Sequence, residues 1–355
     1  MVRVFYFYNM TDFLIVGAGL AGISFAETAL LNEKTFTVVS DASHNSSVVA
    51  AGLYNPVILK RFSLPADAAV HWEYRKPFYR RIEKRLDVKF DHELPVLRRF
   101  ASVEEQNTWF EAADKPALEP FLSTELIRTK YPYLTAPYDF GEVQHTGYVD
   151  TAMLLHVYQN YLRLEDKLVN EKFDHAALKI EHEFISYKNI TAKHIVFAEG
   201  FGIHDNPYFS YLPLDGTKGE LLHIKAPQLQ LNAAVNAGVF ILPIGNDIYK
   251  VGATYEWYDK SATPTEEGKA ELLEKLNELV TCDYEIVAHL AGIRPTTKDR
   301  KALIGTHHIH KNVHLLNGLG TRGVMLGPAM AKELYDSIEQ GRPVDKSVNL
   351  NRFKI

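Results

Sequence analysis

Three glycines close to the N-terminus have the spacing of a turn that binds phosphate. They lie in the sequence Gly17-Ala-Gly-Leu-Ala-Gly22, directly after the apolar run 13–16. In a GxGxxG turn the first glycine permits a tight bend, the second lets the backbone approach a pyrophosphate, and the third lets the following helix pack against the strand. The predicted dinucleotide contacts are Gly17, Ala18, Gly19, Leu20, Ala21 and Gly22.

Polar residues after the next apolar run are candidate partners for the rest of a dinucleotide. An acid that binds a ribose is expected at the end of this second strand; here Ser40 occupies that place and Asp41 follows one residue later. Small residues and hydroxyls fill 42–56, where Ser46, Ser47 and backbone amides could bind a second half of the cofactor. The alternative interpretation of 42–56 is a small-residue loop that packs a helix on a sheet.

Hydrophobic patterns predict the elements that position these residues. A strand at 13–16, a helix at 23–33 and a strand at 36–39 form one right-handed βαβ unit. Further helices are expected at 66–86, 149–164, 265–280 and 328–339, the last with Pro328 near its first turn. Sheet-like patterns occupy 90–102, 179–185, 194–198, 221–224, 239–242, 248–254 and 313–316. A nucleotide-binding lobe is therefore drawn from the beginning, the middle and the end of the chain.

Composition excludes several classes of protein. The chain has 355 residues, of which 46% are hydrophobic and 23% charged, so it can bury a large core and is neither disordered nor a disulfide scaffold. A net charge of −5 gives no global attraction to nucleic acid or anionic lipid. The single cysteine, Cys282, suits a reducing compartment. Residues 1–9 lack a signal-peptide pattern and Met10 is a plausible start, so we expect a cytoplasmic protein.

Five motifs in order along the chain resemble the D-amino-acid oxidase superfamily of FAD-dependent amine oxidases. They are Gly17–Gly22, the stretch SSVVAAGLYNP at 46–56, Val251–Thr254, Ala291–Asp299 with Ile304-Gly305, and Gly318–Pro328. The resemblance runs from about residue 12 to 340 and is strongest to glycine oxidase, sarcosine oxidase and the FAD oxidase half of the bifunctional tRNA 5-methylaminomethyl-uridine biosynthesis enzyme.

The resemblance implies an α/β fold with two lobes. A discontinuous Rossmann-like FAD-binding domain would comprise 1–85, 146–212 and 290–355, and a smaller substrate domain with an antiparallel sheet would comprise 86–145 and 213–289. The FAD is expected to be non-covalent, because Cys282 lies well before the motif that contains Arg294. The fold class is thus of the D-amino-acid oxidase type.

The resemblance also implies roles for individual residues. Arg294 would bind a substrate carboxylate with its planar guanidinium, the alternative being an ion pair with Asp299. Lys250 matches a lysine that promotes the reaction with oxygen in some relatives, the alternative being a solvent-facing lysine on an alternating strand. Arg322 could assist at the flavin or form a surface salt bridge. The remaining expected FAD contacts are Ala50, Ala51, Gly52, Leu53, Phe173, Ala198, Glu199, Gly200, Gly318, Leu319, Gly320, Thr321, Gly323, Val324 and Met325.

Three functions remain open from the sequence. The first is FAD-dependent oxidation of the C–N bond of an amine or small amino acid to an imine that water hydrolyses, with O₂ or another compound as electron acceptor. The second is the same chemistry on a carboxymethylaminomethyl-uridine of tRNA. The third is a non-flavin protein, either an NAD-dependent dehydrogenase or a redox-silent nucleotide-binding protein.

Two charged or metal-like clusters bear on these alternatives. Residues 72–99 contain nine basic and five acidic side chains, which could contact phosphates or form a solvated helix face. His307, His308 and His310 have no cysteine or carboxylate near them in the sequence, and in a strand His307 would point away from the other two. We expect a solvated loop there and no metal site.

Overall fold

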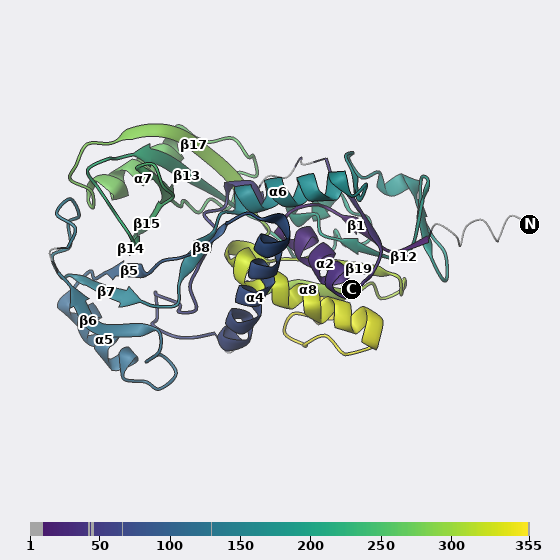
Figure 1. Ribbon diagram of the computed structural model, residues 1–355, viewed down its shortest axis with the longest axis horizontal. Coiled ribbons are helices and arrows are strands. Elements are labelled where there is room, and N and C mark those ends of the chain that lie inside the picture. The colour runs from purple at the N-terminus through teal and green to yellow at the C-terminus, as the bar shows by residue number, and fades with distance from the viewer. Residues whose placement is uncertain (1–9, 42, 44–45, 66, 129, 354–355) are drawn as a thin grey trace, which may run out of the picture.

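The computed structural model describes residues 10–41, 43, 46–65, 67–128 and 130–353. Expectations that fall on 1–9, 42, 44–45 or 66 lie outside the described residues. Two large sheets occupy opposite ends of an elongated molecule, and helices α4 (Ala68–Leu86) and α8 (Gly323–Gln340) lie between them in the view of Figure 1. The mixed α/β architecture predicted from the sequence is confirmed.

The first sheet is built around the predicted βαβ unit. Strand β1 (Met10–Val16) lies between β2 (Phe36–Val39) and β12 (Ile190–Phe197), parallel to both. Its residues 13–16 are buried, which explains the continuous apolar run. Helix α2 (Leu20–Leu31) connects β1 to β2 and begins three residues before the predicted start. The sheet is completed by β9 (Leu168–Val169), β10 (Leu178–Ile180), β11 (Ile185–Tyr187), β18 (Leu303–Thr306) and β19 (Val313–Asn317).

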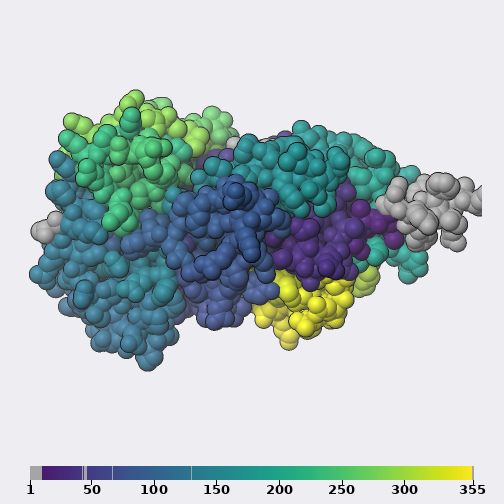
Figure 2. All heavy atoms as spheres, viewed as in Figure 1, coloured from purple at the N-terminus to yellow at the C-terminus, as the bar shows by residue number. Residues whose placement is uncertain are grey.

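Helix α8 returns the end of the chain to the beginning. It packs on α2, and Figure 2 shows yellow C-terminal atoms directly against purple N-terminal ones. The helix begins at Gly323, five residues before the predicted start, so Pro328 lies in its second turn and the prediction was wrong. Proline has no N–H to donate to the carbonyl of Val324, four residues earlier. The Tyr79 hydroxyl of α4 donates to that carbonyl instead, at 2.9 Å, and thereby satisfies the helix.

The second sheet has its strands in the order β17-β13-β16-β15-β14-β5-β7-β6. All neighbours are antiparallel except β14 and β5. Helix α7 (Glu266–Asn277) buries Leu272 and Leu276 against one face, and α5 (Val103–Ala113) buries Trp109 beside β6. The strands are β17 (Glu285–Arg294), β13 (Thr217–Lys225), β16 (Ile248–Gly252), β15 (Val239–Pro243), β14 (Ala234–Ala237), β5 (Val96–Arg99), β7 (Phe140–Val143) and β6 (Leu122–Ile127).

A small sheet joins the two ends of the molecule. Its order is β3 (Leu53–Tyr54), β8 (Gly147–Val149) and β4 (Asp91–Glu93). The sheet-like stretch 90–102 therefore divides at Pro95 between this sheet and β5 of the large one. Helix α6 (Thr151–Leu164) follows β8, the short helix α3 (Ser46–Val49) precedes β3, and the 3-10 turns are η1 (His175–Ala177), η2 (Gly200–Asp205), η3 (Gly320–Arg322) and η4 (Leu350–Arg352). Among the described residues, no helix combines the length and apolarity that crossing a bilayer demands.

Candidate functional site

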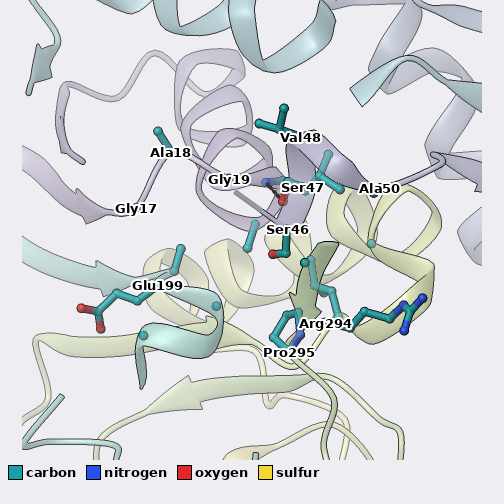
Figure 3. Close-up of a pocket in the computed structure, with 18 of the residues that line it drawn as sticks. Gly17, Ala18, Gly19, Ser46, Ser47, Val48, Ala50, Glu199, Arg294 and Pro295 are labelled. Carbon is teal, nitrogen blue, oxygen red and sulfur yellow. Dashed lines mark hydrogen bonds between the residues drawn. The ribbon is translucent and has the colours of Figure 1, made fainter. Parts of the chain in front are cut away.

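A cavity of about 640 Å³ lies between the two large sheets. Its wall combines the C-terminal end of β1 with β13 and β17 of the second sheet, so residues far apart in the chain meet there. Figure 3 shows Gly17 and Glu199 at one end, Arg294 at the other, and Ser46 and Ser47 between them. A cavity of this size suits an organic cofactor, and its extended lining suits a long one.

The glycine turn is shaped as the fingerprint requires. Gly17 has φ +102°, and a Cβ there would lie 2.5 Å from the Ala198 carbonyl oxygen. A Cβ on Gly22 would lie 1.9 Å from the Gly17 carbonyl oxygen, so only glycine permits this approach of helix and turn. Helix α2 has no side-chain cap from its own N-cap residue Gly19, and the amide of Leu20 donates to the Ser47 hydroxyl at 3.2 Å. The amides and small residues of this turn fit a diphosphate.

Most of the residues predicted to contact FAD line the cavity. Those that line it are Gly17, Ala18, Gly19, Leu20, Ala21, Ser40, Asp41, Ser46, Ser47, Ala50, Ala51, Gly52, Leu53, Phe173, Ala198, Glu199, Gly200, Arg294, Leu319, Gly320, Thr321, Gly323 and Val324. Gly22, Gly318, Arg322 and Met325 do not line it. Gly318 has φ +71° and shapes the turn before η3, Arg322 is exposed, and Met325 is buried within the core around α8.

One end of the cavity is closed by aromatic and acidic side chains. Phe173 stacks on Tyr187 with ring centroids 4.3 Å apart. The carboxylate of Glu199 lies 3.1 Å from His175 Nε2 and accepts a hydrogen bond from the Asn206 side chain at 2.7 Å. Sequence reasoning missed His175, because its turn η1 has no periodic pattern, and likewise the lining residues Gln159, Lys172, Asp174, Ala176, Gly202, Asp205 and Asn317.

Arg294 lies at the opposite end, and no acidic side chain of the described residues pairs with it. Its Nη1 donates to the carbonyl oxygens of Lys218, at 3.3 Å, and Thr254, at 3.2 Å, and its guanidinium lies 4.5 Å from the centre of the Tyr255 ring. Burial lowers the pKa of Arg294, yet an arginine stays protonated. The alternative partner Asp299 is wrong, because its carboxylate pairs with Arg352 at 2.7 Å.

The space for this guanidinium is created by a glycine that the sequence analysis did not identify. A Cβ on Gly219 of β13 would lie 1.9 Å from Nη2 of Arg294 and 2.2 Å from its Cζ. Gly219 pairs with Gly292 of β17, and both line the cavity with Leu221, Phe240, Ala253 and Tyr255. In the sequence, these lining residues are marked only by Gly219 and Gly292, two glycines inside strands that are far apart in the chain.

Lys250 is buried, so the solvent-facing interpretation of this lysine is wrong. Its side chain is outside the cavity lining, and Nζ lies 3.4 Å from the carbonyl oxygen of Ala50, which does line the cavity. Burial lowers the pKa of Lys250, and the charge of Asp150 partly offsets this effect. The structure thus holds a second cation directly behind the cavity wall.

The histidine cluster lies in a loop, as predicted, with His308 exposed, but the loop is not solvated throughout. His307 is buried, and its ring stacks on His310 with centroids 5.0 Å apart rather than pointing away. Burial and the two neighbouring histidines lower the pKa of His307 to about 4. Among the described residues, no group of three or more histidine, cysteine or acidic side chains is placed to hold a metal ion.

The basic residues of 72–99 are largely paired with acids. Arg75 is fully buried against Asp91, Arg85 bonds Glu27, and Arg98 bonds Glu105. Lys76 and Lys89 form further pairs with Glu93 and Glu83. The solvated-face interpretation is wrong for Arg75. Five of the nine basic residues are neutralised by acids within the fold, whereas Arg80, Arg81 and Lys84 are exposed, as that interpretation expects.

Comparisons with known proteins identify the family. The model of the FAD dependent oxidoreductase family matches residues 12–337. The chain belongs to this family. The FAD-dependent oxidoreductase is 26% identical over 239 residues to glycine oxidase of Bacillus subtilis, covering 62% of this chain and 63% of the relative. It is also 26% identical over 197 residues to the bifunctional tRNA 5-methylaminomethyl-2-thiouridine biosynthesis protein of Shewanella halifaxensis, covering 44% of this chain and 30% of the relative.

The fold of this FAD-dependent oxidoreductase agrees with solved structures. Glycine oxidase from Geobacillus kaustophilus superposes with a TM-score of 0.79 at 20% identity, covering 97% of this chain and 99% of that one. The first curated relatives extend beyond the matched region, since this chain spans less than two thirds of their length. Family membership confirms FAD as the cofactor and sets aside the non-flavin alternative.

Proposed function

We propose that this enzyme oxidises the C–N bond of a small amine that carries a carboxylate, with glycine and N-substituted glycines as the substrate class. The observation that carries the proposal is Arg294, a cavity-lining arginine whose ion-pair capacity is not used by any acid in the described part of the chain. A guanidinium binds a carboxylate through two parallel charged hydrogen bonds, which fix both its place and its orientation. The residue roles and domain limits inferred from the resemblance are part of this proposal.

The protein's own residues bind and orient the substrate. Two backbone carbonyls and the Tyr255 ring hold the Arg294 guanidinium, so the carboxylate meets a cation that needs little reorganisation. The buried ammonium of Lys250 behind Ala50 adds positive potential to the wall, where we propose that it assists the reaction with oxygen. The turn at 318–323 would present backbone amides to the cofactor.

The overall reaction removes two electrons and two protons from R–NH–CH₂–COO⁻ and leaves a C=N bond. Water then adds to the imine and releases R–NH₂ and glyoxylate. When bound, FAD supplies the acceptor for the electron pair and passes it to O₂ or to another acceptor. We propose that FAD binds without a covalent link, because Cys282 lies in the core on the far side of the second sheet, among residues that do not line the cavity.

A second candidate substrate is a carboxymethylaminomethyl-uridine of tRNA. The similarity to the tRNA-modifying protein favours it, and the same carboxylate would bind Arg294. Of the nine basic residues in 72–99, five are already paired with acids, and a paired cation binds phosphate weakly, so this segment supports tRNA binding only through the other four. A gel shift of bulk tRNA at two salt concentrations separates the candidates: salt-sensitive binding favours tRNA, and its absence favours a small amine.

The proposal is tested by anaerobic bleaching of the bound flavin. Glycine, sarcosine and other N-substituted glycines should bleach the flavin absorbance, whereas methylamine and ethylamine, which have no carboxylate, should not. Arg294→Lys should raise KM for the bleaching amino acids about 10- to 100-fold, because lysine loses the two-point contact, while FAD remains bound. Bleaching by methylamine alone, or an unchanged KM in Arg294→Lys, would overturn the carboxylate assignment.

A further inference from the structure

A buried ion pair lies on strand β13 directly behind the Arg294 end of the cavity. Gly219 of this strand lies against the Arg294 guanidinium on the cavity face. Side chains alternate along a strand, so its neighbours Lys218 and Glu220 project from the reverse face. Both are buried, and Nζ of Lys218 lies 3.3 Å from a carboxylate oxygen of Glu220. The thickness of one strand therefore separates this pair from the proposed carboxylate-binding arginine.

The carboxylate of Glu220 connects three elements of the fold. It accepts hydrogen bonds from the backbone N–H of Thr265, at 3.0 Å, and from the Thr265 hydroxyl, at 2.8 Å, where helix α7 begins. Nε2 of His289 on β17 lies 2.8 Å from the same carboxylate. Burial raises the pKa of Glu220, but the hydrogen bonds from Thr265 and Lys218 outweigh this effect and lower it below its usual value. Glu220 is therefore charged at neutral pH and ties β13 to β17 and α7.

A short antiparallel ladder joins the same stretch of β13 to the chain that follows β16. Lys218 and Glu256 exchange backbone hydrogen bonds of 2.9 and 3.0 Å. The amide of Thr254 donates to the carbonyl oxygen of Glu220 at 3.2 Å, and the amide of Glu220 donates to the Thr254 hydroxyl at 2.9 Å. Glu220 thus holds this ladder through its backbone as well as through the ion pair of its side chain.

The two carbonyl oxygens that hold Arg294 belong to this ladder. Nη1 of Arg294 donates to the carbonyl oxygen of Lys218, at 3.3 Å, and to that of Thr254, at 3.2 Å. Glu220 contacts both of these residues, the first through the ion pair and the second through the two hydrogen bonds. A displacement of either carbonyl would turn the guanidinium, and a misplacement of about 1 Å in a binding site can cost about 100-fold in rate.

Lys218 has a second acidic partner, so the loss of the Glu220 charge does not leave it buried alone. Its ammonium also bonds the carboxylate of Asp259 and the carbonyl oxygen of Thr263. Without the charge of Glu220, the ammonium would be drawn toward Asp259, and the strand that carries it would follow. We therefore expect the fold to survive this change while the carbonyl oxygen of Lys218 shifts.

We propose that Glu220 is a positioning residue for Arg294: from the reverse face of β13 it fixes the two carbonyl oxygens that aim the guanidinium at the substrate carboxylate. This inference rests on the proposed function, in which Arg294 binds that carboxylate. Glu220 does not line the cavity, so its effect on the substrate passes through Arg294 alone.

The test measures how tightly the holoenzyme binds acetate, the simplest carboxylate, by titration calorimetry. Glu220→Gln keeps the size of the side chain but removes the charge that holds Lys218, so the Kd for acetate should rise about 5- to 30-fold. KM for glycine should rise by the same factor, while kcat changes by less than about twofold, because the loss concerns binding alone. The FAD content should equal that of the wild type.

The matched control is Glu105→Gln in the same large sheet. Glu105 likewise pairs with an arginine, Arg98, at 2.7 Å, and accepts the backbone N–H of Ala101 at 2.7 Å, but it does not contact the Arg294 ladder or line the cavity. This variant should keep the wild-type Kd and KM. A milder variant, Thr265→Val, removes one hydrogen bond to Glu220 at a partly exposed position and should raise the Kd about 2- to 5-fold. Thr265→Val decides the question if Glu220→Gln does not fold.

The combined variant Glu220→Gln/Arg294→Lys separates the positioning role from a general effect on the fold. Its acetate Kd should exceed that of Arg294→Lys alone by less than about twofold, because both changes act on one guanidinium. Additive losses, an equal loss in Glu105→Gln, or a wild-type acetate Kd in the folded Glu220 or Thr265 variants would overturn the role of Glu220 and leave the proposed function intact. If Arg294→Lys itself binds acetate as tightly as the wild type, the proposed function fails instead.

Discussion

Arg75 and Arg294 are both withdrawn from solvent, but the fold treats them differently. Arg75 is fully buried, and its Nη1 contacts both carboxylate oxygens of Asp91, at 2.9 and 2.8 Å. Its guanidinium lies 3.6 Å from the centre of the Tyr54 ring. Arg294 has the aromatic ring and the hydrogen-bond acceptors, but those acceptors are neutral carbonyls. The first arrangement completes an ion pair inside the protein, and the second leaves the pairing capacity for a ligand.

Two buried lysines repeat this difference. Lys218 lies among Asp259 and Glu220, and these contacts raise its pKa against the opposing effect of burial. Lys250 has one long contact to a carbonyl oxygen, and burial lowers its pKa. In each pair the cation with an acid stabilises the framework, and the cation without one lines the cavity or lies directly behind it. The absence of an acidic partner, rather than the degree of burial, distinguishes the candidate functional cations from the structural ones.

The largest effect is expected from breaking the complete pair. Asp91→Ala leaves the Arg75 charge buried without a counter-ion and should lower the free energy of unfolding by about 3–5 kcal/mol, measured by urea denaturation. Arg294→Leu should change the same free energy by less than about 1 kcal/mol, because no acid loses its partner. Glu93→Ala, which removes an exposed pair with Lys76, is the control and should also cost less than about 1 kcal/mol. If Asp91→Ala is no more destabilising than Glu93→Ala, the buried Arg75–Asp91 pair does not have the structural role assigned to it here.

A smaller but more selective effect is expected from Gly219→Ala. The new methyl group would occupy the place of the Arg294 guanidinium, and the flexible arginine must move because the strand backbone cannot. A displacement of this kind should raise KM for a carboxylated amine about 10- to 100-fold with little change in stability.

A double-variant cycle shows whether Gly219 acts through Arg294. The losses from Gly219→Ala and Arg294→Lys should not add in the combined variant, because both remove the same contact. Additive losses in KM would mean that Gly219 affects the site by another route.

The sequence predicts best where one local rule decides the structure. The turn at Gly17 is fixed by its positive φ and by its distance to Ala198, which only glycine tolerates, so the fingerprint is readable without the fold. Strand β14 was not predicted, because its pairing joins distant segments: Asn236 of β14 lies beside Arg98 of β5. The start of α8 was missed since a hydroxyl from another helix, that of Tyr79, compensates for Pro328.

The candidate site was predictable in part for the same reason. Motifs indicated Arg294 and the glycine turn, but whether Arg294 pairs with Asp299 depends on where Arg352 lies near the other end of the chain. Likewise the alternation around Lys250 suggested solvent, whereas the packing of Ala50 over that strand buries it. Tyr255 and Gly219 acquire a role only when β13, β16 and β17 are assembled.

The smallest predicted effect concerns two histidines, His194 and His314, which are buried in their neutral form rather than as cations. His194 and His314 share a hydrogen bond of 3.0 Å, and the Thr306 hydroxyl completes the other side of His314 at 2.9 Å. Burial lowers the pKa of both rings, that of His314 well below its usual value. Because each folded-state pKa lies below the unfolded value of about 6.5, the unfolded chain takes up protons first as the pH falls. Stability is therefore complete above about pH 7 and decreases as the pH falls through 6.5.

The variant His314→Gln isolates this contribution. It should lose about 1 kcal/mol less unfolding free energy than the wild type between pH 7 and about pH 5.5, because glutamine does not titrate. His182→Gln, at an exposed histidine outside both clusters, leaves the His194–His314 pair in place and is the control. Measuring the difference between the two pH values cancels any constant cost of placing glutamine in the core. If His314→Gln and the wild type lose the same unfolding free energy between the two pH values, the His194–His314 pair does not control the pH dependence of stability.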